Sequence, residues 1–419
     1  MAFLSQYVTS KYDPKDTATF KDHFGAPTVE QLPSPLELFW TDVWGIIKNI
    51  RLLPDVLRPF FTTNPDDELY LLPPSGLSIW WWSLFSFLQI PPMLILIALS
   101  ILTISLLQLL SNLHSLLFWS PIQGPSLQVF PPSPPRNSNP RHRWLFINGI
   151  AVPAHGLHQN LRVLSTTFNA PVLGIHNRTY GFLGDLVECV FQRSFAYRTL
   201  ETRLAVPVLS KYLLAPDAEV EKVVLVAHSQ GGICAADVLD QVFATVPWER
   251  IHDRLEVYTF GSAAGHFRNP WMDAAGTGSR RRLVRRMEHY CHEDDMVTSF
   301  GALSALQKEG NPYKGEVFVW KGKPGHLLNQ HYLKDMFNPE TVGKKGSFFE
   351  GKVVPYKAGE KGDGENGRWY VEPGMEVGEG EKRVKDLSYL WRYMVGKEEE
   401  KVDEMMDGKT RDSVKVNGH

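Results

Sequence analysis

The sequence predicts an α/β protein with a mostly parallel sheet flanked by helices and an N-terminal membrane-inserted helical segment. Three observations support this prediction. Strand and helix patterns alternate between residues 143 and 338, which indicates parallel strands joined by helices. A β-branched run leads into a turn centred on Ser229. No Lys, Arg, Asp or Glu occurs from Leu69 to Pro135, a pattern typical of membrane segments.

Charge and cysteine content narrow the function classes. The 419 residues suffice for one large domain with accessory segments, and the net charge of −2 gives no global field that favours nucleic acid. Cys189, Cys234 and Cys291 are widely spaced and odd in number, which indicates neither a disulfide framework nor a zinc site. We therefore expect no nucleic-acid partner and no bound metal, and the sequence identifies no protein partner.

Residues 1–68 form a polar and amphipathic N-terminal region. The chain starts without the basic and then apolar pattern of a signal peptide. From Pro35 to Phe61, apolar residues recur at helical spacing among Asp42, Lys48 and Arg51. This predicts one or two amphipathic helices. They could pack on the main domain or lie on a membrane surface, since Trp and Phe beside basic residues suit that boundary.

Residues 69–130 form the predicted membrane segment. Met93–Phe118 is mainly Leu and Ile, and as a helix it would measure about 39 Å against a hydrocarbon core of about 30 Å. The aromatic run Trp80–Trp82 and Trp119 flank it, as in an interface belt. Pro91-Pro92 leaves two alternatives open, which are a single span from about residue 93 and a hairpin with both ends on one side.

The charges around this segment favour one topology. Acidic residues precede it, whereas Arg136, Arg141 and Arg143 follow it. By the positive-inside rule, the domain after the segment is expected in the cytosol. The protein is thus predicted to be a membrane protein, anchored by a single pass or a hairpin, with a cytosolic catalytic domain.

The remaining chain divides into three parts. Residues 131–142 are a Pro-rich linker, residues 143–338 the predicted catalytic domain, and residues 339–419 a largely charged, partly disordered extension. The predicted strands are Arg143–Ile147, Pro171–Ile175, Val223–Val226, Leu255–Phe260, Leu283–Tyr290 and Glu316–Trp320. The predicted helices are Leu157–Phe168, Leu183–Gln192, Tyr197–Leu213, Gly232–Phe243, Leu327–Phe337 and Val384–Val395.

The motif from Val223 to Cys234 organises this domain. A buried strand leads into Ala227-His228-Ser229-Gln230-Gly231, and a helix of small and apolar residues follows. So sharp a turn strains the serine backbone and needs small residues on both sides, which Ala227 and Gly231 supply. The helix start places unpaired N–H groups beside the serine, so the Gln230 N–H is a candidate oxyanion donor.

A Ser-centred turn between strand and helix is the nucleophile elbow. On this motif, residues 143–338 resemble the lipases and esterases of the α/β-hydrolase superfamily, although Ala227 replaces the more usual Gly. The resemblance implies a Ser nucleophile, then an Asp or Glu, then a His along the chain. The acid is expected after the strand ending near Tyr290, and Asp295 fits because Asp-x-Val is a frequent lipase pattern. Asp294 and Glu293 are alternatives, and the acidic turn could simply be hydrated.

The resemblance places the histidine in the loop before the final helix. His326 follows Pro324-Gly325, a turn signal, whereas His331 is predicted inside the helix and is the alternative. Lipases often have His-Gly in the loop that supplies the second oxyanion donor. This chain has Asn148-Gly149-Ile150 there, so the N–H of Ile150 is the candidate.

These residues predict a membrane-anchored serine hydrolase that resembles lipases and carboxylesterases. Ser229, His326 and Asp295 would act as nucleophile, base and orienting acid, with no metal or organic cofactor. Membrane anchoring favours a lipid ester as substrate. An acyltransferase with the same triad and a non-catalytic membrane scaffold are the alternatives, because fold alone does not determine chemistry.

Overall fold

The computed structural model describes only part of the chain. The described residues are 35–53, 64, 66, 87, 88, 90–92, 124–131, 138–195, 197–273, 280–308, 312–356 and 367–395. Most of the predicted membrane segment, with the choice between single span and hairpin, lies outside these residues, as does most of the linker. Within them, no helix has the length and apolar character needed to cross a bilayer.

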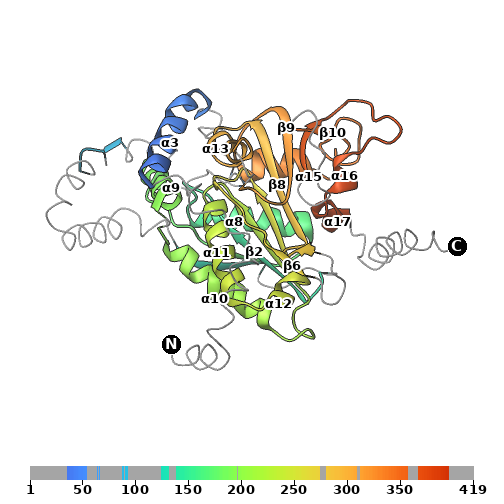
Figure 1. Cartoon of the computed structure of the whole chain (residues 1–419), viewed down its shortest axis with the longest axis horizontal. Coiled ribbons are helices and arrows are strands. Elements are labelled where there is room, and N and C mark those ends of the chain that lie inside the picture. Colours follow the sequence, from blue (N-terminus) through green and yellow to red (C-terminus); the bar gives the residue numbers. More distant parts are fainter. Residues whose placement is uncertain are drawn as a thin grey trace.

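Nine strands of the described chain form one twisted sheet (Figure 1). Their spatial order is β1 (Leu127–Phe130), β3 (Val172–Ile175), β2 (His142–Ile147), β4 (Lys222–His228), β5 (Leu255–Phe260), β8 (Arg286–Asp294), β9 (Glu316–Pro324), β11 (Arg368–Glu372) and β10 (Lys352–Pro355). All neighbouring pairs are parallel except the two edge pairs, β1 with β3 and β10 with β11. The mostly parallel sheet predicted from the sequence is confirmed.

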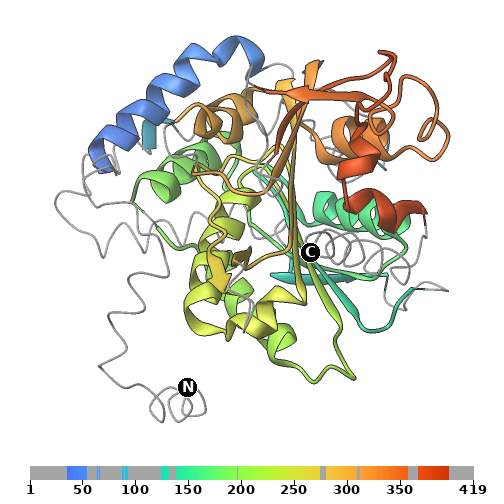
Figure 2. The same cartoon turned by 45° about the vertical axis from the view of Figure 1, so that its right-hand side comes forward.

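Helices cover both faces of the sheet, which Figure 2 shows nearly edge-on. One face carries α9 (Phe182–Phe195), α10 (Leu200–Leu214), α11 (Gly231–Thr245), α13 (Met296–Phe300) and α14 (Ala302–Leu306). The other carries α8 (Ala154–Phe168), the π-helix η5 (Leu328–Leu333), α15 (Lys334–Phe337), α16 (Val384–Leu387) and α17 (Leu390–Val395). Alternate residues of a strand point to opposite faces of the sheet. Leu145 packs in the hydrophobic core on the first face and Phe146 in the core on the second.

The described chain also includes smaller elements. These are the helix α3 (Pro35–Lys48), the short 3₁₀ helix η3 (Ile50–Leu52), α12 (Trp248–His252) and the two-stranded β6 (Trp271–Asp273) and β7 (Arg280–Arg282). The sequence left two placements open for α3, and the structure shows that it packs against α9 and α13.

Two boundaries predicted from the sequence are wrong. β1 was assigned to the membrane segment but pairs with β3 along its whole length. The sheet also continues past Asn338, because β11 adds to β9 in parallel and β10 adds to β11. The chain between 339 and 395 is therefore partly folded onto the domain. β10 and β11 have only 4 and 5 residues, too few to show a clear period in the sequence.

Two elements differ in extent from their sequence predictions. The strand expected at Leu283–Tyr290 runs instead from Arg286 to Asp294. The helix expected from Leu327 begins as a π-helix, because the Leu327 carbonyl accepts from both the His331 and the Tyr332 N–H groups. π-Helical turns are rare in proteins, but those that occur are often found at functional sites.

Candidate active site

Ser229 lies in a strained turn between β4 and α11. Its φ is 57°, in the left-handed region that a residue other than glycine seldom adopts, as expected for a nucleophile elbow. A Cβ on Gly231 would overlap the carbonyl oxygen of Ile147. One on Gly232 would overlap the Ser262 hydroxyl. The two glycines let the helix start against the end of β2 and the loop after β5, and this holds the serine hydroxyl at the carboxyl end of the sheet.

A continuous hydrogen-bond chain links Ser229, His326 and Asp295. The Ser229 Oγ lies 2.8 Å from His326 Nε2, and His326 Nδ1 lies 2.7 Å from Asp295 Oδ2. All three residues are buried. The Nδ1–H of His326 donates to the carboxylate, which leaves Nε2 free to accept the serine proton. This is the geometry required of a nucleophile, a general base and an orienting acid.

Asp295 is held as a carboxylate by three donors. Besides His326, it accepts hydrogen bonds from the Val297 N–H and the Tyr332 hydroxyl, each at 2.8 Å. Burial by itself would raise the pKa of Asp295, but the neighbouring His326 and these donors hold it below its usual value. A carboxylate kept ionised in this way can fix the tautomer of His326 and stabilise its protonated form.

The alternative residues from the sequence lie elsewhere. Asp294 is exposed at the end of β8, and Glu293 accepts from the Gly322 N–H at 2.8 Å. His331 is half-buried, and its Nδ1 accepts from the Leu327 N–H at 3.0 Å. The structure brings none of the three to Ser229.

Two further histidines support the catalytic loop from behind. His228 Nε2 donates to the carbonyl oxygen of His326 at 2.8 Å, and His292 Nδ1 donates to that of Gly325 at 2.9 Å. Burial lowers the pKa of His228 to about 3 and that of His292 to about 4. Both rings are therefore neutral near pH 7, and they hold the backbone that carries His326 without adding charge to the site.

The loop after β2 approaches the serine closely. A Cβ on Gly149 would overlap the Ser229 side chain, so only glycine fits there. Ile150 lines the same cavity as Ser229. Ala151 has a φ of 55° and donates its N–H to Asp185 Oδ2 at 2.8 Å. Asp185 on α9 therefore holds the conformation of the loop that carries Ile150, one of the two predicted oxyanion donors.

A buried amide network surrounds the other predicted donor, Gln230. Its side-chain oxygen accepts from Asn177 Nδ2 at 2.6 Å, and its Nε2 donates to Glu188 and Gln192 at 3.0 Å each. Burial, with Asp185 nearby, raises the pKa of Glu188 to about 8. Glu188 is thus protonated at neutral pH, and it places no negative charge beside the expected oxyanion.

The site lies where the order of strands in the sheet reverses. From β2 the chain goes to β3 on one side and then returns to β4 on the other. In open parallel sheets ligands bind at such switch points, outside the carboxyl ends of the strands. The Ile150 loop follows β2, Ser229 follows β4, Asp295 follows β8 and His326 follows β9.

A small apolar cavity adjoins Ser229. Its volume is about 20 Å³, room for about one water molecule. Apart from Ser229 its lining is formed by Leu53, Ile150, Phe182, Leu186, Cys189, Ala263, Met296, Val297 and Phe300. This lining suits an apolar acyl group.

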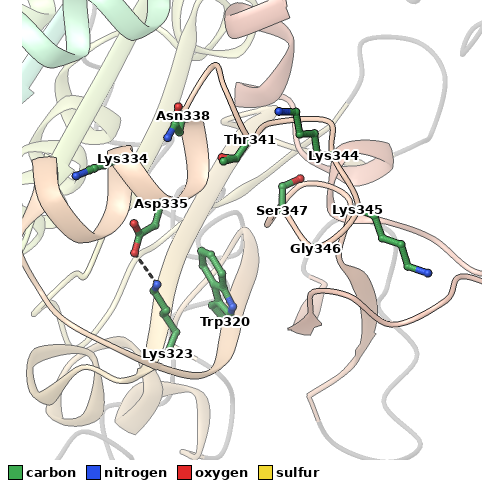
Figure 3. A pocket seen from close by; sticks show the side chains of 10 residues that line it. All are labelled: Trp320, Lys323, Lys334, Asp335, Asn338, Thr341, Lys344, Lys345, Gly346 and Ser347. Atoms are coloured by element: carbon green, nitrogen blue, oxygen red, sulfur yellow. Dashed lines mark ion pairs between the residues drawn. The ribbon is translucent and has the colours of Figure 1, made fainter.

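A larger hollow of about 430 Å³ lies at the outer end of β9 and does not include Ser229 (Figure 3). Within it Lys323 pairs with Asp335 at 2.5 Å, and Figure 3 shows the Lys345 side chain extending away from the hollow. Its lining is charged and contains none of the triad residues, so the smaller apolar cavity is the candidate active site.

Sequence reasoning missed several residues of the site. Tyr332 gave no signal, because it stands in an ordinary helical pattern. Asn177-Arg178-Thr179 has the form of a glycosylation sequon, which gives no hint of a site role, yet the Asn177 side chain is buried and bonded to Gln230. Asp185 and Glu188 are spaced three apart on α9, which places both on one helix face, and this spacing was the available signal.

Comparison with known proteins gives limited matches. No family model matches this chain, and no curated protein does. Among solved structures, an arylesterase has a TM-score of 0.30 at 11% identity, covering 49% of this chain and 75% of its own. An esterase of Pyrobaculum calidifontis has a TM-score of 0.30 at 11% identity, with coverages of 48% and 72%.

A thermostable carboxylesterase cloned from a metagenomic library gives a similar match. Its TM-score is 0.30 at 13% identity, with coverages of 48% and 75%. All three TM-scores are 0.30, too low to identify the fold, which is identified instead by the sheet topology and the elbow. On those features, the described chain has an α/β-hydrolase-like fold, with a mostly parallel sheet between two helical layers.

Proposed function

We propose that this protein is a membrane-anchored serine hydrolase that cleaves carboxylic esters, and that its substrates are lipid esters. The observation that carries the proposal is the buried chain from Ser229 through His326 to Asp295, with links of 2.8 and 2.7 Å. The apolar lining of the adjoining cavity supports an acyl group as the bound part of the substrate. The charge-free stretch from Leu69 to Pro135 supports a membrane location.

Each residue has one role in the proposed reaction. The Ser229 Oγ attacks the ester carbonyl carbon while His326 Nε2 takes its proton, and the N–H groups of Gln230 and Ile150 hold the resulting oxyanion. His326 then gives the proton to the leaving alcohol. Water, deprotonated by His326, cleaves the acyl-enzyme and frees Ser229. Asp295 holds the imidazole and stabilises its charged form throughout.

A fluorophosphonate probe tests the nucleophile. The probe should label the wild-type protein at Ser229, and Ser229→Ala should abolish labelling and lower ester hydrolysis by several powers of ten. His326→Ala should lose as much hydrolysis as Ser229→Ala, and the double variant no more, since triad members act as a unit. Equal labelling of wild type and Ser229→Ala would show that Ser229 is not the nucleophile and would exclude the proposed serine-hydrolase mechanism.

Neighbouring residues supply matched controls. Asp295→Asn should lower kcat by about 10⁴-fold, whereas Asp294→Asn, a change at the exposed neighbour, should leave kcat unchanged. His331→Ala should lower the melting temperature and keep much of the activity. Product analysis with added alcohols separates hydrolysis from acyl transfer, because a transferase would release mainly the new ester.

Alkaline carbonate extraction tests the anchor. The full-length protein should stay in the membrane pellet, and a chain starting at Arg136 should be released more readily. Release of the full-length protein by carbonate would show that the charge-free stretch is not inserted, while leaving the triad chemistry untouched.

A further inference from the structure

The roof of the candidate active site has an outer surface as well as an inner one. On the inside, Leu53 beside η3, Phe182 and Leu186 of α9, and Met296 and Phe300 of α13 line the Ser229 cavity. On the outside, α3, η3 and α9 expose large apolar side chains. We call these residues the apolar face, and they are Trp40, Trp44, Ile47, Ile50, Val187, Phe191 and Phe195.

The apolar face follows the helical spacing of each element. Trp40, Trp44 and Ile47 lie four and three residues apart on α3, and Val187, Phe191 and Phe195 lie four apart on α9. Trp40 and Trp44 are 64% and 67% exposed, values that are high for tryptophan in a folded domain.

Ring contacts join the two helices into one continuous surface. The ring centroid of Phe39 on α3 lies 5.3 Å from that of Trp40 on the same helix. It lies 6.4 Å and 6.3 Å from the ring centroids of Phe191 and Phe195 on α9. Phe191 and Phe195 lie 5.4 Å apart. A continuous exposed patch of this kind usually marks an interaction site, whereas single exposed apolar residues do not.

The charges on these helices are segregated. The acidic side chains that the structure describes on these helices point inward, where Asp42 pairs with Arg193, Asp185 binds the Ala151 N–H and Glu188 binds Gln230. Among the described side chains of α3, η3 and α9, the exposed charged ones are Lys48 and Arg51. Trp and Phe with basic residues, and no exposed acid among the side chains described here, complement the anionic boundary of a lipid bilayer.

The chain continues from this face toward its charge-free stretch. Residues 54–68 separate Leu53, next to η3, from Leu69, where the stretch without Lys, Arg, Asp or Glu begins. A membrane anchor attached at that point would hold α3 close to the bilayer. We propose that the apolar face lies on the lipid surface, so that the cavity roof meets the bilayer that contains the substrate. This inference rests on the proposed function and specifies how the site is oriented.

Fluorophore labelling of the full-length protein in vesicles tests the orientation. Cys189, Cys234 and Cys291 are buried, so a thiol-reactive fluorophore should react only with an introduced cysteine. Ile47→Cys and Phe191→Cys place the label on the apolar face. Met375→Cys is the matched control, because Met375 is 57% exposed and follows β11, which lies beside the edge strand β10.

The labelled proteins are placed in phosphatidylcholine and phosphatidylserine vesicles with and without brominated acyl chains. We expect brominated lipid to quench the labels at 47 and 191 several-fold more than the label at 375, and aqueous iodide to give the reverse order. Strong iodide quenching at 47 and 191 would overturn the proposal, because the face would then lie in water. Shielding from both quenchers would also overturn it, because a second copy or another segment of the chain would then cover the face.

Enzyme activity gives a second measure. The double variant Trp44→Gln/Ile47→Gln should hydrolyse a lipid ester in vesicles several-fold more slowly and a water-soluble ester at the wild-type rate. A double variant that hydrolyses both esters at the wild-type rate would contradict the proposal. Fluorophosphonate labelling of Ser229 in the same samples reports the proposed function separately, and the quenching result does not depend on it.

Discussion

Asp42 of α3 and Arg193 of α9 form a buried ion pair, with 3.1 Å between Asp42 Oδ1 and Arg193 Nη2. The same guanidinium donates to the Phe300 carbonyl oxygen at 3.1 Å. One side chain thus joins α3 to α9 and α13, the two helices that contribute residues to the lining of the Ser229 cavity. Because an unpaired buried charge is costly, the position of α3 depends on this pair.

The first prediction concerns that pair. Asp42→Ala should lower the free energy of unfolding by about 3–5 kcal/mol, because it leaves the Arg193 charge buried without a partner. Urea unfolding measures this change. Asp66→Ala, which removes the exposed partner of Arg162, is the control and should cost less than about 1 kcal/mol. Equal costs in the two variants would mean that α3 is not held by the ion pair.

Tyr332 is predicted to position the acid of the triad. Tyr332→Phe removes one donor to Asp295, so kcat should fall about 3- to 10-fold, the equivalent of about 0.5–1.5 kcal/mol. KM should stay unchanged, because Tyr332 does not line the cavity. Tyr290→Phe is the control, since its hydroxyl binds Glu288 away from the site. An unchanged kcat for Tyr332→Phe would remove Tyr332 from the mechanism.

Asp185 is predicted to set the conformation of the oxyanion loop. Asp185→Asn leaves fewer acceptors for the Ala151 and Tyr180 N–H groups and the Thr179 hydroxyl. We expect kcat to fall about 10-fold with KM little changed, because oxyanion stabilisation acts mainly on the transition state. Asp237→Asn, at a half-buried acid on α11 outside the site, should keep full activity.

The same residue predicts a pH dependence of stability. Burial raises the pKa of Asp185 to about 6, above the ordinary value of 3.8 that applies to the unfolded chain. Between these values the folded state keeps a proton that the unfolded state has released, so this group's contribution to stability falls as pH rises from about 4 to about 6. Melting curves should show a smaller change over this window in Asp185→Asn than in wild type. An identical change in both proteins would contradict the shifted pKa.

Close packing at the elbow predicts a steric effect. Gly231→Ala forces a Cβ against the Ile147 carbonyl oxygen and should cost about 3 kcal/mol or prevent folding. Gly343→Ala is the control. Gly343 has a φ of 80° with open space around it, so only the backbone cost of about 1 kcal/mol remains. Chemical denaturation of both variants compares the two costs.

The last prediction concerns the chain after Asn338. Buried Glu288 on β8 accepts from the Tyr389 N–H at 2.5 Å and from the Ser388 hydroxyl at 3.2 Å. Truncation after Asn338 removes these donors and exposes the edge of β9, so the shortened protein should aggregate or fail to fold. Truncation after Val395 should leave the melting temperature within a few degrees of wild type. A stable, active protein ending at Asn338 would show that β10 and β11 are dispensable.

The sequence by itself determined the features that depend on neighbouring residues. The strand before Ser229, the small residues around it and the helix after it are all encoded within Val223–Phe243, so the elbow could be located without the fold. The central strands could be recognised from their β-branched runs, because a strand buried on both faces consists mainly of apolar, β-branched residues. The family resemblance placed the candidate histidine in the loop before the final helix, and the turn signal Pro324-Gly325 favoured His326 over His331.

Only the tertiary structure decided between neighbouring acids. Glu293, Asp294 and Asp295 are consecutive, and their directions depend on where β8 ends. Because β8 runs to Asp294, that side chain lies at the exposed strand end, and Asp295 turns inward to cap α13 and meet His326. A shift of the strand end by a few residues, below the precision of a sequence pattern, changes which carboxylate faces the site.

The supporting residues also required the fold. Tyr332 reaches Asp295 across 37 positions of sequence, and Asp185 reaches Ala151 across 34. The edge strands β10 and β11 are stabilised by pairing with β9 and not by a pattern of their own. Turns, strands and helix starts depend on the chemistry of neighbouring residues, so the sequence alone could show them. Contacts between distant segments depend on how the sheet and helices pack, so only the structure could show them.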